Sequence, residues 1–158
     1  MELVAVAAIA ENRALGRAGE IPWPSLPADR RQYRERVADS PVILGRRTFQ
    51  SMLEDLPGRR HLVLSRSLDD IPVDTATIVR SPEEAIDVAE RSGAECVYVI
   101  GGGRVYESFL PHYDRMILTR VPGRYAADTY FPDWDRTEWE CVDETAYENF
   151  TVEEWVRR

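Results

Sequence analysis

The chain of 158 residues contains no lysine: all 20 basic residues are arginine, against 28 aspartates and glutamates. The resulting net charge of −8 argues against nucleic acid or an anionic membrane as the main partner. Two explanations of the missing lysine stay open. A GC-rich genome favours arginine codons, whereas an acidic surface suits high salt, where the Debye length falls to about 3 Å. The excess of acid favours adaptation to salt.

Cysteine and long apolar runs are also scarce. The chain has only Cys96 and Cys141, and we expect both to be reduced thiols in the core of a cytoplasmic protein, although one disulfide between them stays open. No apolar run approaches the ~20 residues of a membrane helix. The opening MELVAVAAIAEN lacks the basic leader of a signal peptide. The length suits one domain, residues 1–158.

Six short β-rich runs, each bounded by turn residues, predict strands. They cover residues 2–10, 41–45, 60–65, 75–80, 95–101 and 115–121. Several are apolar throughout, which is typical of parallel strands covered on both faces. The tail WECVDETAYENFTVEEW alternates around a Tyr147–Asn149 turn and predicts an antiparallel hairpin. The fold class is therefore α/β, with a mostly parallel sheet and an antiparallel edge.

Helices are predicted between the strands. In SPEEAIDVAERSG, Ser81 is the expected N-cap, Glu84 closes a capping box and Gly93 ends the helix. A second helix is predicted over RTFQSMLEDLPG, where one face is apolar and holds Phe49, Met52, Leu53 and Leu56.

Three glycines stand between an apolar strand and a short helix in VIGGGRVYESFL. In open α/β sheets ligands bind at the carboxyl ends of strands, and glycines let backbone N–H groups approach a phosphate. A plain tight turn is the alternative. The motif is not the Rossmann fingerprint, because Tyr106 stands at the third glycine position, and the chain has no Walker A sequence. An ordinary dehydrogenase or nucleoside triphosphatase is therefore disfavoured.

Four arginines follow the carboxyl ends of predicted strands: Arg46, Arg47, Arg66 and Arg104. The first two open a helix, where cations oppose the macrodipole unless an anion lies between them and the helix. A solvated pair at the surface is the alternative. Four such arginines in an acidic protein favour one ligand with several phosphates, and NADPH fits better than a single phosphate group.

Asp29 shares a helix face with apolar neighbours. On a helix that starts near Ala28, Asp29, Tyr33 and Val37 lie on one side, since residues four apart are neighbours. The alternative is a first-turn acid that interacts with the helix dipole. A carboxylate facing an apolar cleft needs a compensating donor, and a planar ligand with two adjacent N–H groups would supply it.

The motif LGRAGEIPW, residues 15–23, followed by LPAD resembles the signature of the dihydrofolate reductase family. GRRTF, LPGR, LSR, VIGGGRVY, LTR and DTYFP resemble later motifs of that family, in the same order and over essentially the whole chain. The resemblance implies that family's fold, with about eight strands and about four helices. It also implies a monomeric, cytoplasmic enzyme that reduces dihydrofolate to tetrahydrofolate with NADPH.

The resemblance further implies roles for individual residues. Asp29 would bind the pterin and assist protonation of N5, Thr119 would hydrogen-bond that carboxylate, and Trp23 would help to hold an ordered water. The substrate pocket would be lined by Val6, Ala7, Ala8, Tyr33, Met52, Leu56, Arg59 and Ile100, with Arg59 gripping the carboxylate of the glutamate tail. NADPH would be held by Ala8, Leu15, Gly16, Ile21, Arg46, Arg47, Thr48, Leu64, Ser65, Arg66, Gly101, Gly102, Gly103, Arg104 and Val105.

The same resemblance implies a cis Gly–Gly peptide, expected at Gly101–Gly102 rather than at Gly102–Gly103. Leu15, Gly16 and Ile21 would belong to a loop that closes over the nicotinamide. The sequence departs from the family at Arg30, where an apolar contact to the substrate is frequent.

Two rival functions remain at this stage. A riboflavin-pathway reductase of the same fold would lack both the LGRAGEIPW element and the carboxylate on the pocket helix. A non-catalytic NADPH-binding module would keep the arginines but would have no need of an inward Asp29. Neither His61 nor His112 has the spacing of a metal ligand, so we expect no metal.

Overall fold

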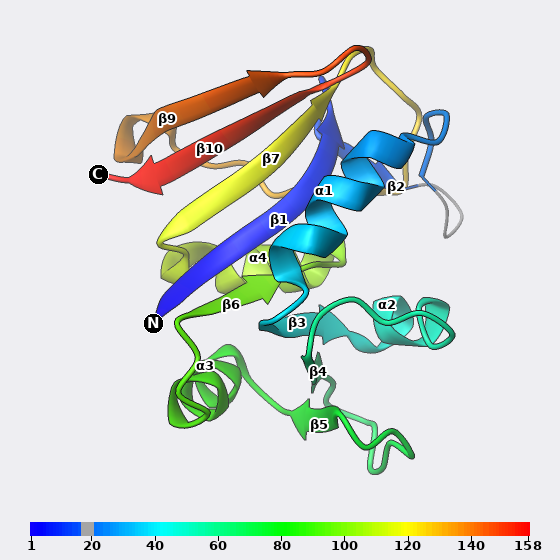
Figure 1. Cartoon of the computed structure of the whole chain (residues 1–158), viewed down its shortest axis with the longest axis vertical. Coiled ribbons are helices and arrows are strands. Elements are labelled where there is room, and N and C mark those ends of the chain that lie inside the picture. The colour runs from blue at the N-terminus through cyan, green and yellow to red at the C-terminus, as the bar shows by residue number, and fades with distance from the viewer. Residues whose placement is uncertain (17–20) are drawn as a thin grey trace.

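A computed structural model describes residues 1–16 and 21–158 of the protein. Eight strands form one sheet in the order β5-β4-β3-β6-β1-β7-β10-β9, which fans across Figure 1. These strands are β1 (Glu2–Ala10), β3 (Pro41–Gly45), β4 (Arg60–Leu64), β5 (Ala76–Val79), β6 (Cys96–Val99), β7 (Arg115–Val121), β9 (Trp139–Ala146) and β10 (Thr151–Arg157). The strands from β5 to β7 run parallel, whereas β10 is antiparallel to both β7 and β9. The predicted sheet and its antiparallel C-terminal edge are confirmed.

Within the described residues, four α-helices connect or cover the strands: α1 (Pro27–Val37), α2 (Arg46–Ser51), α3 (Pro82–Arg91) and α4 (Gly103–Phe109). Two short 3-10 helices, η1 (Leu110–His112) and η2 (Arg136–Glu138), follow later in the chain. A separate two-stranded sheet pairs β2 (Ala14–Gly16) with β8 (Thr129–Tyr130). It was not predicted, because segments of two or three residues carry no readable period. No helix of the described residues is both long and apolar enough to cross a membrane.

The sheet has an apolar layer on each face, and β1 contributes to both because successive side chains point to opposite sides. Leu3, Ala5, Ala7 and Ile9 belong to the first cluster, which also contains buried residues of α3 and α4. Val4 and Val6 belong to the second cluster, together with Val37 of α1 and Phe49 of α2. Figure 1 accordingly shows α1 in front of β1 and α4 behind it.

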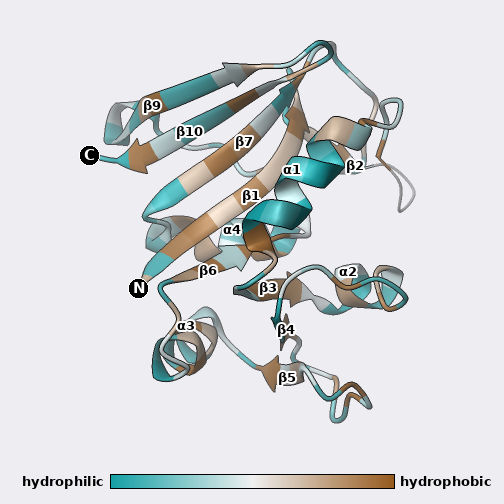
Figure 2. Cartoon of the chain, viewed as in Figure 1, coloured by the Kyte–Doolittle hydropathy of each residue, from teal (hydrophilic) through white to brown (hydrophobic). Residues whose placement is uncertain are grey.

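Helix α1 is polar over most of its surface, as its colour in Figure 2 shows. Pro27 stands in its first turn, where a proline removes no intrahelical hydrogen bond. Its predicted inward stripe is confirmed: Val37 is fully buried, while Asp29 and Tyr33 are partly buried. This helix therefore brings its carboxylate to the face of the sheet that holds the second cluster.

Helix α2 is shorter than predicted, because it ends at Ser51 instead of continuing toward Leu56. The hydroxyl of Ser51 donates to the carbonyl of Thr48 at 2.8 Å, a local bond that competes with helix continuation. A turn follows, in which the Asp55 N–H donates to the Met52 carbonyl at 2.9 Å. The predicted apolar face is therefore wrong at Leu53, whose side chain is exposed.

Helix α3 has the predicted cap at each end. The Ser81 hydroxyl accepts from the Glu84 N–H at 3.1 Å, and Gly93 follows the helix with a φ of 78°. The capping box is not closed as predicted, because the Glu84 carboxylate accepts from the Arg80 N–H, at 3.3 Å.

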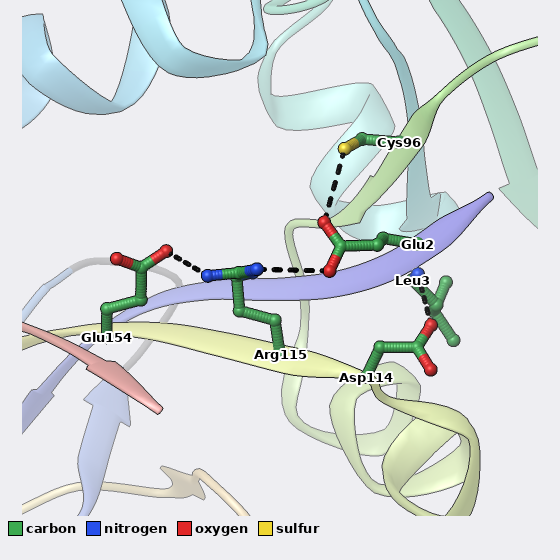
Figure 3. A network of polar contacts seen from close by, with 6 residues as sticks. All are labelled: Glu2, Leu3, Cys96, Asp114, Arg115 and Glu154. Atoms are coloured by element: carbon green, nitrogen blue, oxygen red, sulfur yellow. Dashed lines mark hydrogen bonds and ion pairs between the residues drawn. The ribbon is translucent and has the colours of Figure 1, made fainter. Parts of the chain in front are cut away.

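At the end of the sheet where β1 begins, one arginine joins three strands (Figure 3). Arg115 of β7 binds Glu2 of β1 at 3.1 Å and also binds Glu154 of β10. The thiol of Cys96 in β6 lies 3.8 Å from the Glu2 carboxylate, so the network extends across four neighbouring strands. This end of the sheet is opposite the carboxyl ends of the parallel strands, where sequence analysis expects the ligands. Cys96 and Cys141 are both free thiols, but the predicted core position is wrong for Cys141, which is exposed on β9.

Candidate active site

The predicted pair of Asp29 and Thr119 is in direct contact. The Thr119 hydroxyl of β7 donates to Asp29 Oδ1 at 2.6 Å, and the two residues are 90 positions apart in the chain. Thr119 is buried, and it lies on the same face of β7 as Ile117 of the second cluster. The alternation of β7 therefore aims this hydroxyl at α1.

Gln32 is a second donor to the same carboxylate that sequence analysis missed. Its side-chain amide donates to Asp29 Oδ1 at 2.9 Å, one turn along α1. The spacing of three residues was the available signal, since such pairs are neighbours on a helix. A carboxylate has about four acceptor sites on its two oxygens. Asp29 thus keeps acceptor capacity for a ligand after both internal bonds are made.

A cleft of about 560 Å³ opens between α1 on one side and the end of α2 with the segment that follows it on the other. Arg30, Tyr33 and Arg34 line it from α1, and residues 50–55 line it from the other side. Burial raises the pKa of Tyr33 to about 12, so its phenol is protonated at neutral pH. Its hydroxyl is buried without a hydrogen-bond partner among the described residues.

Most predicted pocket residues belong to the second cluster or pack against it. Val6 and Ile100 belong to the second cluster, and Tyr33, Met52 and Leu56 pack against it. Ala7 lies elsewhere, because its side chain packs in the first cluster, on the face covered by α3 and α4. Any contribution of Ala7 to the pocket is thereby restricted to its backbone.

Trp23 lies in a third cluster with Ala10, Ala14 and Val121. Ala8 and Leu26 pack against this group, and Leu26 also packs against the second cluster. The ring of Tyr125 meets Trp23 edge-on at 5.9 Å between centroids. Trp23 is therefore fixed beside the pocket residue Ala8, whereas Ile21 is exposed. Residues 17–20 of the LGRAGEIPW motif lie outside the described residues.

The expected cis peptide is present between Gly101 and Gly102. The carbonyl of Gly101 accepts from the Gly45 N–H at 2.9 Å, which joins the carboxyl ends of β6 and β3. Tyr106, which distinguishes this loop from a Rossmann fingerprint, donates its hydroxyl to the Val6 carbonyl at 2.7 Å. A Cβ on Gly101 would lie 3.4 Å from that ring. The tyrosine thus packs the glycine loop against β1, a role that the sequence did not reveal.

The glycine loop meets two other segments predicted to hold NADPH. A Cβ on Gly102 would lie 3.6 Å from Thr48 Oγ1, and a Cβ on Gly103 would lie 3.8 Å from Leu15 Cδ1 and only 2.8 Å from Thr129 Cγ2. Leu15 and its neighbour Gly16 were expected in a loop, but they belong to strand β2, which pairs with β8. The glycine loop, the start of α2 and strand β2 therefore come together at the carboxyl edge of the sheet. Any side chain at position 103 would collide with Thr129 there.

The remaining cofactor predictions occupy the same edge. Val105 packs in the first cluster behind the loop, and Leu64 packs against that cluster. Ser65 is buried, and its hydroxyl accepts from the Leu68 N–H at 3.1 Å. The arginines expected to bind phosphate are all exposed: Arg46, Arg47, Arg66 and Arg104. Exposed guanidinium groups at the carboxyl ends of the neighbouring strands β3, β4 and β6 fit the several phosphates of NADPH.

The predicted tail-binding residue lies just before β4. Arg59 is exposed, and its N–H donates to the Ser40 carbonyl at 2.9 Å. An ion pair across the cleft was not predicted: Arg34 binds the Asp55 carboxylate at 2.7 Å, and Arg30 lies 3.5 Å from it. Arg30, the departure from the family pattern, therefore contacts the opposite wall of the cleft.

Comparisons with known proteins agree with this site. The family model for dihydrofolate reductase matches residues 2–155. The chain is 38% identical to "Dihydrofolate reductase HdrB" of Haloferax volcanii over 166 residues, which cover all of this chain and 84% of that protein. It is 38% identical to "Dihydrofolate reductase 1" of Haloarcula marismortui (98% of this chain, 90% of that protein) and 32% identical to a dihydrofolate reductase of Bacillus subtilis (83% and 76%). With its motifs, its sheet order and its Asp29–Thr119 pair all in agreement, the chain belongs to the dihydrofolate reductase family.

Proposed function

We propose that residues 1–158 act as one monomeric, cytoplasmic domain that reduces 7,8-dihydrofolate to tetrahydrofolate with NADPH. The observation that carries this proposal is the inward carboxylate of Asp29, held by Thr119 at 2.6 Å on the face of the sheet that holds the apolar second cluster. A binding module would have no need of a carboxylate on this stripe.

Asp29 accepts hydrogen bonds from the 2-amino group and N3 of the pterin, which satisfies the acceptor capacity left by Thr119 and Gln32. A carboxylate held near the pterin also favours protonation at N5, the proton that makes C6 electrophilic. Trp23 helps to hold an ordered water near Asp29. Val6, Ala8, Tyr33, Met52, Leu56 and Ile100 surround the pterin and its ring substituent, and they exclude bulk water.

NADPH, when bound, supplies the hydride. The cofactor binds against the segments that come together at the carboxyl edge of the sheet, which are the glycines at 101–103, Thr48, Leu15 and Gly16. The arginines at 46, 47, 66 and 104 bind its phosphates. The protein contributes orientation and a dry pocket, which are the contributions expected of a cofactor-dependent enzyme.

The first test follows the loss of NADPH absorbance after dihydrofolate is added to the protein in high salt. We expect Asp29→Asn to lower kcat/KM by about 100-fold or more, the scale of general acid–base assistance. Asp39→Asn, an exposed carboxylate near the end of the same helix, is the matched control and should leave turnover unchanged. A folded protein that binds NADPH without turning over would contradict the enzyme and favour a binding module.

The cofactor site has a separate test. Arg66→Gln should weaken NADPH binding by about tenfold and leave NADH binding within about twofold, because only NADPH carries the additional phosphate. Fluorescence titration measures both constants without turnover. Equal losses for the two cofactors would place Arg66 away from that phosphate.

A further inference from the structure

We propose that His61 is a positioning residue for substrate binding: its buried ring holds the turn that presents Leu56 and Arg59 to the substrate. This inference rests on the proposed function, since it assigns Arg59 to the carboxylate of the substrate's tail. The chain's other motifs and clusters leave His61 without a role, although it is one of only two histidines.

The ring of His61 is enclosed and both of its nitrogens are bonded. The residue is 3% exposed, with Nε2 at 2.9 Å from the Pro57 carbonyl and Nδ1 at 2.8 Å from Thr75 Oγ1. A carbonyl can only accept, so Nε2 carries the proton and Nδ1 accepts from the Thr75 hydroxyl. Burial lowers the pKa of His61 and thereby maintains this neutral tautomer near neutral pH.

Contacts other than the bond to His61 also constrain the turn formed by residues 56–59. Gly58 has a φ of 84°, and a Cβ there would lie 2.7 Å from Val42 Cγ1, so the turn sits directly on β3. The Arg59 N–H is bonded to the Ser40 carbonyl at 2.9 Å. The bond from His61 to Pro57 fixes the side of the turn that leads to Leu56, and Leu56 packs against the second cluster.

On the side away from this turn, His61 is held in the sheet. His61 lies in β4 opposite Val42 of β3 and Ala76 of β5, and its N–H donates to the Thr75 carbonyl at 3.0 Å. Phe49 of α2 flanks the ring at 6.5 Å between centroids. Because the ring is buried, it does not contact the substrate. It influences substrate binding only through the position of the backbone of residues 56–59.

A matched pair of substitutions separates the two bonds of His61. In His61→Gln the amide nitrogen stands near the position of Nε2 and keeps the bond to Pro57. In His61→Asn the shorter amide reaches only the position of Nδ1, so the bond to Pro57 is lost while a polar partner for Thr75 remains. His112→Asn is the control, because this histidine lies in η1 beside Glu83, at 3.8 Å.

The measurements compare dihydrofolate with a dihydropterin that lacks the benzoylglutamate tail. We expect His61→Asn to raise both KM and the equilibrium Kd for dihydrofolate by about five- to tenfold, with kcat and the dihydropterin KM within about twofold. His61→Gln should restore the binding of dihydrofolate to within about twofold of the unmodified protein. Equal losses for the two substrates, or no loss for either, would overturn the proposal.

A double-mutant cycle with Arg59→Ala tests the route of the effect. If His61 acts through Arg59, adding His61→Asn to Arg59→Ala changes the Kd for dihydrofolate by less than about twofold. The same fold-loss in both backgrounds would overturn the proposal. An Arg59→Ala variant that binds dihydrofolate normally would also overturn it, whereas absence of turnover in the unmodified protein would contradict the proposed function itself.

Discussion

Thr119 donates its hydroxyl to Asp29 Oδ1 across 2.6 Å, and this bond connects the first turn of α1 to the middle of the sheet. Hydrogen bonds to an ionised acceptor are shorter and stronger than neutral ones. Since Asp29 is only partly buried, a ligand can reach the carboxylate while Thr119 holds its orientation from within the sheet.

Removal of that hydroxyl tests the orientation. Thr119→Val keeps the shape of the side chain, and we expect it to lower kcat/KM by about tenfold, the effect of one charge-assisted hydrogen bond. Thr119→Ser keeps the donor and should stay within about threefold of the unmodified protein. Steady-state kinetics at neutral pH measures both. Equal activity of the valine and serine variants would show that Asp29 is oriented without Thr119.

Tyr33 contributes its ring to the second cluster, yet its hydroxyl is buried without a partner among the described residues. An unsatisfied buried hydroxyl costs about 1–3 kcal/mol. Tyr33→Phe should therefore raise the free energy of unfolding by about 1 kcal/mol, seen in urea as a higher midpoint with an unchanged m value. A lower midpoint would mean that the hydroxyl is satisfied in the folded protein in solution.

The fold and the centre of the site were predictable because their signals are periodic or repeated. The alternation of β1 and the four-residue spacing of Asp29, Tyr33 and Val37 decide which face each side chain takes. The glycine loop was predictable from motif order, and the cis peptide at Gly101–Gly102 followed from the resemblance to the family.

What could not be predicted depends either on a local choice between hydrogen-bond partners or on contacts between distant segments. The Ser51 hydroxyl bonds to the Thr48 carbonyl where α2 ends, and the Glu84 carboxylate accepts from the Arg80 N–H instead of from the N–H of the N-cap residue. The bond from Tyr106 to Val6 joins residues 100 positions apart. No period or local motif carries this long-range pairing, because it depends on how the complete sheet brings two segments together.

Arg115 separates two carboxylates that otherwise face each other at the start of the sheet (Figure 3). We expect Arg115→Gln to lower the free energy of unfolding by about 1–2 kcal/mol at low salt, and by less in concentrated KCl, where repulsion between Glu2 and Glu154 is screened. Arg91→Gln breaks only an exposed pair with Asp87 and should change stability by less than about 0.5 kcal/mol. Chemical denaturation at two salt concentrations measures both variants. Similar losses for the two would show that the network adds nothing beyond a surface pair.

The net negative charge should also make the stability of the whole protein rise with salt concentration. With a net charge of −8 and two relatives from halophilic archaea, the chain should unfold more easily as KCl is removed, because its self-repulsion is then unscreened. Circular dichroism during dialysis from about 2 M to about 0.05 M KCl follows this change. A protein that stays fully folded and equally stable at low salt would leave the absence of lysine to codon usage alone.

His61 gives stability a dependence on pH. Burial lowers the pKa of His61 in the folded state, whereas a histidine in the unfolded chain has a pKa near 6.5. As the pH falls, the unfolded chain therefore binds the proton at a higher pH than the folded protein does. The contribution of this residue is therefore complete above about pH 6.5 and is lost as the pH falls through the lowered folded value. Urea denaturation between pH 5 and 8 should show a steeper acid decline for the unmodified protein than for His61→Gln, while His112→Gln should retain the full decline. If His61→Gln and the unmodified protein declined in parallel, the carboxylates would account for the acid sensitivity, and the ring of His61 would accept its proton equally well in the folded and unfolded states.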